Sequence, residues 1–183
     1  ANRAKSIKLL AKTPTIIANF DRHRKGKPMV KPDPTVGLAA NFLWMLNGAV
    51  PTAAVARALD VCLVLHADHG LNASTFAARV TISTLSDMYS AITTAIGTLK
   101  GPLHGGANEE VMHMLNEIGT MENIEPYIRA KLARKELVMG FGHRVYKALD
   151  PHAGYLKTFA KQIASDTGNQ RLYEMSTRIE DIM

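Results

Sequence analysis

Three short motifs place histidines among glycines and polar side chains. In chain order they are His66-Ala-Asp-His69-Gly-Leu-Asn72, Gly101-Pro-Leu-His104-Gly-Gly-Ala-Asn108 and Gly140-Phe-Gly142-His143-Arg-Val-Tyr-Lys147. Histidine is the side chain whose ordinary pKa lies closest to neutrality, and glycine lets the backbone come close to a ligand. Together these residue types predict proton transfer to or from a small polar or anionic molecule.

The second motif stands where a helix is expected to begin. Pro102 cannot continue the helix before it, and Gly105-Gly106 precede a helical pattern. His104 is therefore expected at a helix N-terminus, where free backbone amides and the helix dipole favour negative charge. Such a position favours a neutral imidazole, which can donate a hydrogen bond to a developing enolate oxygen.

The third motif combines a glycine-rich segment with positive charge. A dinucleotide-binding fingerprint is excluded, because the third glycine, the preceding strand and the alternation of strands and helices are missing. Backbone amides, one histidine and the two cations Arg144 and Lys147 suit a carboxylate or a phosphate. The motif therefore predicts an anion-binding loop.

The first motif has two competing interpretations. His66 and His69 are three residues apart, which would place them on one face of a helix as metal ligands. A helix end near Gly70 argues against this, as does the lack of a cysteine cluster or a His-Glu-x-x-His pattern. We therefore expect no metal, and we expect His66 to be buried and hydrogen-bonded. A metal-dependent lyase or hydrolase is the less favoured alternative.

The elements that must position these motifs are helical. Alternating strand patterns bounded by hairpin turns are missing from the sequence, so we expect an all-α protein. Residues 3–20 predict one or two helices with a break near Thr13-Pro14, and the proline-rich residues 25–34 predict a loop. Another helix is expected to follow Ser74 and Thr75. The remaining expected helices cover about 37–46, 52–65, 86–99, 108–118 and 124–135, with two more in 150–183 broken near Gly168-Asn169.

The segment between Thr75 and Leu99 is rich in small residues and poor in charge. Small side chains let helices approach closely. The segment therefore fits either a dimer interface or an ordinary buried core, and the residues alone do not choose between them.

The composition is that of a globular chain of 183 residues, 46% hydrophobic, with a formal net charge of +6. No apolar run approaches the length of a membrane span, and the first residues do not resemble a signal peptide. The excess of basic residues lies within residues 1–35, and its basic stretch, residues 22–27, has no interleaved stacking aromatics, so we expect neither nucleic acid nor a membrane as a partner. The single cysteine, Cys62, is expected to be a small buried side chain in a reducing, cytoplasmic compartment.

Taken together, the three motifs resemble the citrate synthase family, which includes the 2-methylcitrate synthases. The resemblance is almost letter for letter and keeps the family's order, with His69 and His104 35 positions apart and His104 and His143 39 positions apart. It rests on residues 66–75, 101–109 and 139–151.

The resemblance implies a multi-helical, all-α fold of the citrate synthase type. Residues 1–100 would be part of the large helical domain, and residues 101–183 would be most of the small domain. The resemblance also implies a homodimer, with the helices at about 75–99 in its interface.

The resemblance assigns a role to a histidine of each motif. His69 resembles the residue that holds oxaloacetate, and His143 the residue that binds oxaloacetate and protonates its carbonyl group. His104 resembles the histidine that donates a hydrogen bond to the thioester oxygen of acetyl-CoA and stabilises the enol. The resemblance gives a supporting role to three residues near these histidines: Asn72, Ser74 and His66. It also gives Asn72 a role in substrate binding.

Other positions match the family's contacts to CoA and to substrate carboxylates. Lys147 matches a contact to a CoA phosphate. His152 stands where the family usually has an arginine that grips a substrate carboxylate, and histidine is shorter and not always charged. The segments that match the lining of the CoA site contain Leu103, Val138, Met139, Gly140, Phe141 and Gly142.

The implied activity is that of an acyltransferase that condenses acetyl-CoA with oxaloacetate to give citrate and CoA, at the entry to the tricarboxylic acid cycle, without a cofactor. Family members are roughly twice this length, and their catalytic aspartate, in a later Asn-Val-Asp motif, has no counterpart before Met183. We therefore expect the isolated 183-residue chain to be inactive. Two alternatives stay open: a 2-methylcitrate synthase that uses propionyl-CoA, and a non-catalytic module that binds CoA or another anion.

Overall fold

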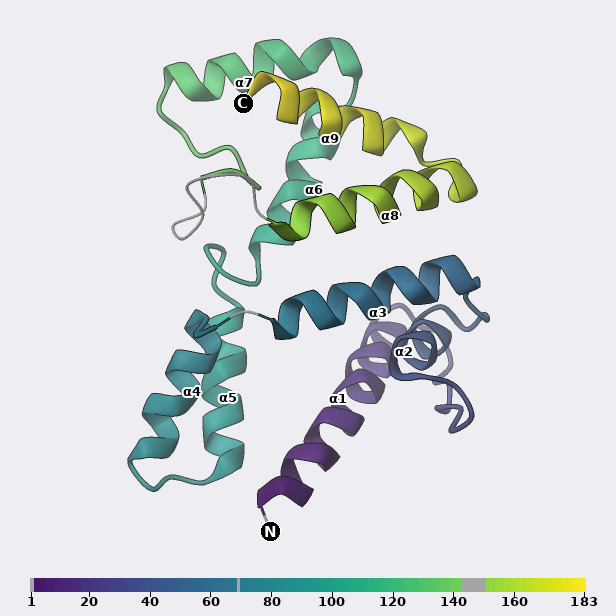
Figure 1. The fold of residues 1–183 in the computed structure, drawn as a ribbon, viewed down its shortest axis with the longest axis vertical. Helices are drawn as coiled ribbons and strands as arrows, with labels where there is room; N and C mark the ends of the chain where they lie inside the picture. The colour runs from purple at the N-terminus through teal and green to yellow at the C-terminus, as the bar shows by residue number, and fades with distance from the viewer. Residues whose placement is uncertain (1, 69, 143–150) are drawn as a thin grey trace. The chain divides into compact units, whose positions relative to one another are not determined.

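The computed structural model describes residues 2–68, 70–142 and 151–183, and every regular element within those ranges is a helix (Figure 1). The expectation of an all-α protein is confirmed. The chain forms two compact units, Ala1–His69 and Gly70–Met183. The domain boundary that the resemblance implies near residue 100 stays a prediction.

The first unit contains α1 (Asn2–Arg24), α2 (Leu38–Asn47) and α3 (Ala53–Ala67), and α2 packs against both of the others. Thr52 caps α3, because its hydroxyl oxygen accepts a hydrogen bond from the backbone amide of Val55 at 3.3 Å. The expected helices at about 37–46 and 52–65 are thus confirmed.

A buried arginine ties the proline-rich loop to α2. Arg22 on α1 is 6% exposed. Its Nε donates to the carbonyl oxygen of Pro28 at 2.6 Å, and its Nη1 donates to the carbonyl oxygen of Leu46 at 3.2 Å. Through these two hydrogen bonds, Arg22 links the proline-rich loop to the end of α2.

The break expected at Thr13-Pro14 is wrong, because α1 continues through Pro14. A proline inside a helix removes one backbone hydrogen bond and crowds the carbonyl group four residues before it. The Thr13 hydroxyl donates to the carbonyl oxygen of Leu9 at 2.7 Å, whereas the carbonyl group that loses its amide donor to the proline is that of Leu10.

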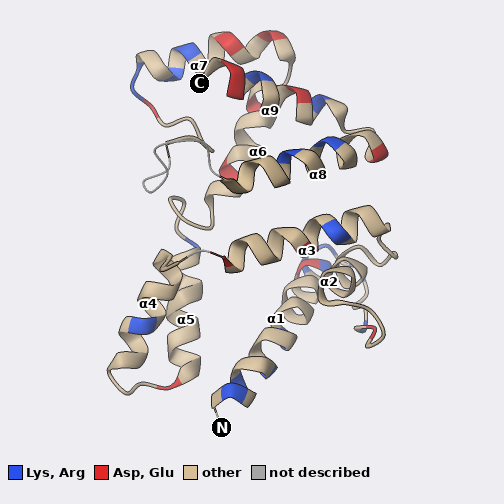
Figure 2. Ribbon diagram, in the orientation of Figure 1, with Lys and Arg blue, Asp and Glu red and all other residues tan. Residues whose placement is uncertain are grey.

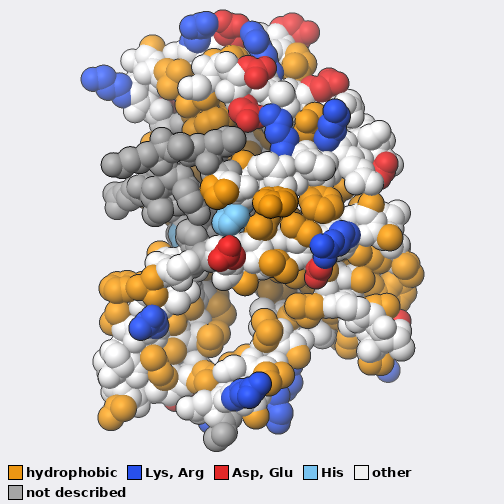
Figure 3. Space-filling model, viewed as in Figure 1, with side chains coloured by type: hydrophobic (Ala, Val, Ile, Leu, Met, Phe, Trp, Pro, Cys, Tyr) orange, Lys and Arg blue, Asp and Glu red, His pale blue; other side chains and the backbone are white. Residues whose placement is uncertain are grey.

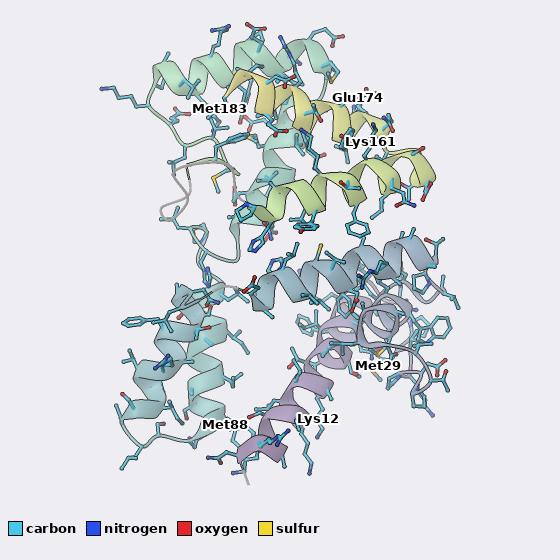
Figure 4. All side chains as sticks on the ribbon, viewed as in Figure 1. Lys12, Met29, Met88, Lys161, Glu174 and Met183 are labelled. Atoms are coloured by element: carbon cyan, nitrogen blue, oxygen red, sulfur yellow. The ribbon has the colours of Figure 1, made fainter. Side chains whose placement is uncertain are left out.

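The second unit begins with a helical hairpin of α4 (Ala73–Ser83) and α5 (Met88–Leu99), which pack along each other. The start of α5 is the expected one. The Asp87 carboxylate accepts hydrogen bonds from two backbone amides in its first turn, at 2.8 and 3.0 Å. Figure 4 labels Met88 at this start, near the tip of the hairpin.

The start of α4 lies earlier than expected. Asn72, rather than Ser74 or Thr75, is the cap, because its Oδ1 accepts from the backbone amide of Thr75 at 2.9 Å. Asparagine and serine are nearly equal as caps, so cap preference alone does not separate Asn72 from Ser74. The consequence for the site is that Ser74 lies inside the first turn of α4.

The rest of the second unit contains α6 (Ala107–Ile118), the short 3₁₀ helix η1 (Met121–Asn123), α7 (Ile124–Ala133), α8 (Pro151–Thr167) and α9 (Gln170–Ile182). The expected break near Gly168-Asn169 is confirmed. Helix α9 contacts α6, α7 and α8. The buried core that these helices share consists of Met114, Leu115, Ile118, Ile124, Ile128, Val138, Met175 and Ile179.

Charge is unevenly distributed over the second unit. Figure 2 colours charged residues along the ribbons of α7, α8 and α9, whereas Arg79 and Asp87 are the charged residues from 73 to 99. Large apolar side chains are exposed on the same hairpin, among them Phe76 at 57% and Ile96 at 60%, and Figure 3 shows apolar surface there. Such a surface is typical of an interface, and the dimer interface stays a prediction.

None of the helices in the described residues is long and apolar enough to cross a membrane.

Candidate active site

His104 lies in a tight turn, residues 101–106, between α5 and α6. The backbone amides of His104 and Gly106 both donate to the carbonyl oxygen of Gly101, at 3.0 and 3.2 Å. The carbonyl oxygen of His104 accepts from the amide of Ala107, the first residue of α6, at 3.3 Å. His104 therefore stands just before a helix N-terminus, as the sequence predicted.

The two glycines after His104 are required by packing inside the chain. A Cβ atom at Gly105 would lie 2.5 Å from the carbonyl oxygen of Leu99, at the end of α5. A Cβ atom at Gly106 would lie 3.1 Å from Cα of Pro102. Gly105 thus lets the turn fold against the end of α5, and Gly106 lets the turn close on Pro102.

The side chain of His104 is hydrogen-bonded to Ser74. The distance from Ser74 Oγ to His104 Nε2 is 2.7 Å, and both residues are half-buried. Because Asn72 caps α4, Ser74 is held in the first turn of that helix. The structure thus brings together one residue from the first motif region and one from the second, 30 positions apart.

His66 belongs to the last turn of α3 in the first unit. Its Nδ1 donates to the carbonyl oxygen of Cys62 at 2.6 Å, because a carbonyl oxygen can only accept. The expected hydrogen bond is present, but the expected burial is wrong, since His66 is exposed. Cys62 was also expected to be buried and is half-buried instead, and this partial burial raises the pKa of its thiol.

The segment from Val138 to Gly142 is fixed at its start. The Val138 side chain is 5% exposed and forms part of the core, so only its backbone is open to a ligand. Met139 packs against the same core, and the amide of Phe141 donates to the carbonyl oxygen of Val138 at 3.2 Å. Gly140 and Gly142 have φ values of +92° and +79°, a region that strongly favours glycine.

One residue that the sequence interpretation did not single out lies against this segment. A Cβ atom at Gly140 would be 3.4 Å from Cγ2 of Val111, on α6. The available signal was helical spacing, because Val111 precedes Met114, Leu115 and Ile118 by three, four and seven positions. That spacing indicates a core-facing residue, but not what it touches.

The structure places two further residues of the predicted site, and three others fall outside the described residues. Leu103 is 82% exposed in the same turn as His104. His152 is half-buried in the first turn of α8. His69, His143 and Lys147 lie outside the described residues, so their roles stay predictions.

An open groove on the second unit contains none of these residues. It measures about 550 Å³ and lies along α8, where Figure 4 labels Lys161, with Tyr173 contributed by α9. Lys157 in this groove is paired with Glu180 at 2.7 Å. Over the part of the chain that the structure describes, no group of three or more His, Cys, Asp or Glu residues could hold a metal ion.

Comparison with known proteins gives a single family. The family described as "Citrate synthase, C-terminal domain" matches residues 1–183. Citrate synthase 2 of Bacillus subtilis is 59% identical over 183 residues, which is 100% of this chain and 49% of that protein. A 2-methylcitrate synthase of Mycobacterium tuberculosis is 52% identical over 171 residues, covering 93% of this chain and 44% of that protein. The chain thus spans about half the length of the curated relatives it matches.

Solved structures give the same result. The citrate synthase of Pyrobaculum aerophilum matches with a TM-score of 0.87 at 45% identity, over 96% of this chain and 44% of that one. The citrate synthase of Thermoplasma acidophilum, solved as a ternary complex with carboxymethyl coenzyme A and oxaloacetate, matches with a TM-score of 0.86 at 39% identity. That match covers 92% of this chain and 45% of the other.

Proposed function

The chain belongs to the citrate synthase family, and from that premise we propose that it acts in an acyltransferase that condenses acetyl-CoA with oxaloacetate to give citrate and CoA. This reaction is the entry to the tricarboxylic acid cycle. Support comes from relatives of about twice the length that carry the name citrate synthase. We propose that these residues contribute the enol-stabilising histidine and a large part of the CoA-binding surface.

The observation that carries this proposal is the hydrogen bond between Ser74 and His104. If the Ser74 hydroxyl donates, Nε2 of His104 accepts, and the imidazole proton must then lie on Nδ1. A neutral imidazole with Nδ1–H is a donor for the thioester oxygen of acetyl-CoA. As the methyl group loses a proton, negative charge grows on that oxygen and the hydrogen bond strengthens.

The place of His104 before α6 favours the same chemistry. The positive end of a helix dipole stabilises an oxygen that is becoming negative. Placing a fixed dipole where charge develops costs no rearrangement during the reaction, so it lowers the barrier to enol formation.

The remaining roles are proposals that follow from the family resemblance. His69 would hold oxaloacetate, His143 would bind it and protonate its carbonyl group, and Lys147 would contact a CoA phosphate. Asn72 would act mainly through the cap that positions Ser74. His152 would bind a substrate carboxylate more weakly than the arginine that is usual in the family, because the histidine side chain is shorter and not always charged.

We further propose that the protein works without a cofactor or a metal, in the cytoplasm, and as a homodimer through α4 and α5. The support for the dimer is the apolar, nearly uncharged surface of that hairpin. Neither nucleic acid nor a membrane is proposed as a partner.

A second candidate substrate deserves its own test, because a 2-methylcitrate synthase is 52% identical to this chain. Propionyl-CoA differs from acetyl-CoA by one methylene group, which a pocket distinguishes by only about 1–3 kcal/mol. The ratio of kcat/KM for the two thioesters decides between them. A ratio that favours propionyl-CoA would mean that the product is 2-methylcitrate rather than citrate.

The proposal is tested by assaying CoA release from acetyl-CoA and oxaloacetate. Two samples are compared: the full-length native protein that carries these residues, and the 183-residue chain alone. We expect turnover only in the first, because the chain contains no counterpart of the family's aspartate base. If the native protein binds CoA and oxaloacetate but forms no product from either thioester, the protein is a non-catalytic binding module.

A further inference from the structure

Helix α6 connects the two segments of the candidate site that the structure describes most completely. At its N-terminal end, the turn that carries His104 is bonded to Ala107. The carbonyl oxygen of Gly106 accepts from the amide of Glu110 at 3.2 Å, so the turn continues directly into the helical hydrogen bonds. The His104 turn and α6 therefore behave as one rigid piece.

The second connection is made one helical turn further along. Val111 lies four residues after Ala107, which is about 6 Å along the helix axis. It is half-buried and packs against the core cluster. Its Cγ2 faces Gly140, where an added Cβ atom would be 3.4 Å away.

The segment that Val111 touches has little freedom on its other side. Val138 anchors it in the core, and the amide of Phe141 donates to the Val138 carbonyl oxygen. The conformation at Gly140, with φ of +92°, strongly favours glycine. Among the described residues, Val111 is the side chain that comes within 4 Å of the Cβ position at Gly140, so it fills the space on the α6 side of this turn.

We propose that Val111 is a positioning residue that sets the distance between the His104 turn and the Val138–Gly142 segment. This inference rests on the proposed function, because it assumes that acetyl-CoA is held by the segment while its thioester meets His104. Both ends of one ligand must fit at once, so a change of a few tenths of an ångström in this spacing weakens binding and misaligns the thioester.

The test uses the full-length native protein that carries these residues. Val111→Ala removes the contact, and we expect the KM for acetyl-CoA to rise about five-fold and kcat to fall, with the KM for oxaloacetate unchanged. Val111→Ile keeps the Cγ2 methyl group and is expected to restore near-normal values. Leu172→Ala is the matched control, because Leu172 packs against the same core from α9. It is expected to lower the Tm without changing the KM for acetyl-CoA.

A double-mutant cycle adds a second readout. Gly140→Ala places a Cβ atom against Val111, so the effects of Gly140→Ala and Val111→Ala on CoA affinity are expected to be non-additive. Affinity is measured by titration calorimetry with CoA alone, which does not depend on turnover. Additive effects, or a Val111→Ala protein that is folded and binds CoA normally, would overturn the proposal. Failure of the unchanged protein to make product, with the CoA coupling still present, would overturn the proposed function instead.

Discussion

Ser74 Oγ and His104 Nε2 lie 2.7 Å apart, which ties the first turn of α4 to the turn that precedes α6. The bond depends on a chain of local causes. Asn72 caps α4 and fixes where that helix begins, and Gly105 lets the His104 turn fold against the end of α5. A change in any of these residues is therefore expected to alter the orientation of the His104 ring.

The first prediction concerns Ser74 itself. Ser74→Ala removes the partner of Nε2, so the His104 ring loses both its orientation and its preferred tautomer, and we expect kcat/KM for acetyl-CoA to fall about ten-fold. The measurement is steady-state kinetics on the full-length native protein. Ser83→Ala on the same helix is the control, because the Ser83 hydroxyl donates only locally, to the carbonyl oxygen of Val80. Equal kcat/KM values for the two variants would show that Ser74 does not contribute to the reaction through His104.

The second prediction concerns Gly105. In Gly105→Ala the new Cβ atom would lie 2.5 Å from the backbone carbonyl oxygen of Leu99, which cannot turn aside as a flexible side chain can, so we expect a loss of about 2–3 kcal/mol in the free energy of unfolding. Gly154→Ala in α8 is the control, since nothing lies within 4 Å of its added Cβ atom. Alanine is the better helix former, so this control is expected to gain up to about 1 kcal/mol. Chemical denaturation measures both, and a stable Gly105→Ala protein would show that the turn is looser than described.

How far the sequence predicts this molecule can be judged from particular residues. Helix starts at Thr52 and Asp87 were predictable, because capping residues act within three positions of the amides they bind. The start at Asn72 was misjudged because Ser74 is a competing cap two positions later. The break at Pro14 was misjudged because a local pattern does not show that the other turns of a 23-residue helix outweigh the cost of one proline.

The site shows the same limit. His104 before a helix was predictable from the proline and glycines that surround it. The contact between Val111 and Gly140 and the approach of Gly105 to Leu99 depend on how helices pack in three dimensions, and no local pattern encodes them. The exposure of His66 likewise depends on what covers the end of α3.

The third prediction concerns pH and the link between α7 and α9. Glu125 is hydrogen-bonded to Arg129 at 2.6 Å and to Arg178 at 2.9 Å, and these arginines hold the pKa of Glu125 below its ordinary value of 4.5. A carboxyl group whose pKa is lowered by folding adds stability above its unfolded pKa and loses it as pH falls through the folded value.

The Tm difference between the unchanged protein and Glu125→Gln should therefore be largest near neutral pH and disappear in acid. Thermal unfolding followed from pH 7 to pH 3 measures it, and Arg178→Gln should show the same trend because it removes the partner on α9. A Tm difference that persists unchanged at pH 3 would mean that charge is not its cause.

The fourth prediction concerns the hairpin of α4 and α5. If it forms the interface between two copies, Phe76→Asp and Ile96→Asp should each convert a dimer to a monomer, since a buried unpaired carboxylate is costly. Size-exclusion chromatography with light scattering gives the mass. Leu137→Asp is the control, because Leu137 is 66% exposed outside the hairpin and should leave the dimer intact. A monomeric unchanged protein, or dimers in both hairpin variants, would contradict the interface.

The most direct measurement is the effect of His104→Ala on two quantities in the full-length native protein: the rate of citrate formation and the affinity for oxaloacetate. If His104 stabilises the enol of acetyl-CoA, kcat should fall by about 10²–10³-fold or more, while oxaloacetate binding, measured by calorimetry, stays within about two-fold. Retained turnover, or an equal loss of turnover and oxaloacetate binding, would contradict that role for His104.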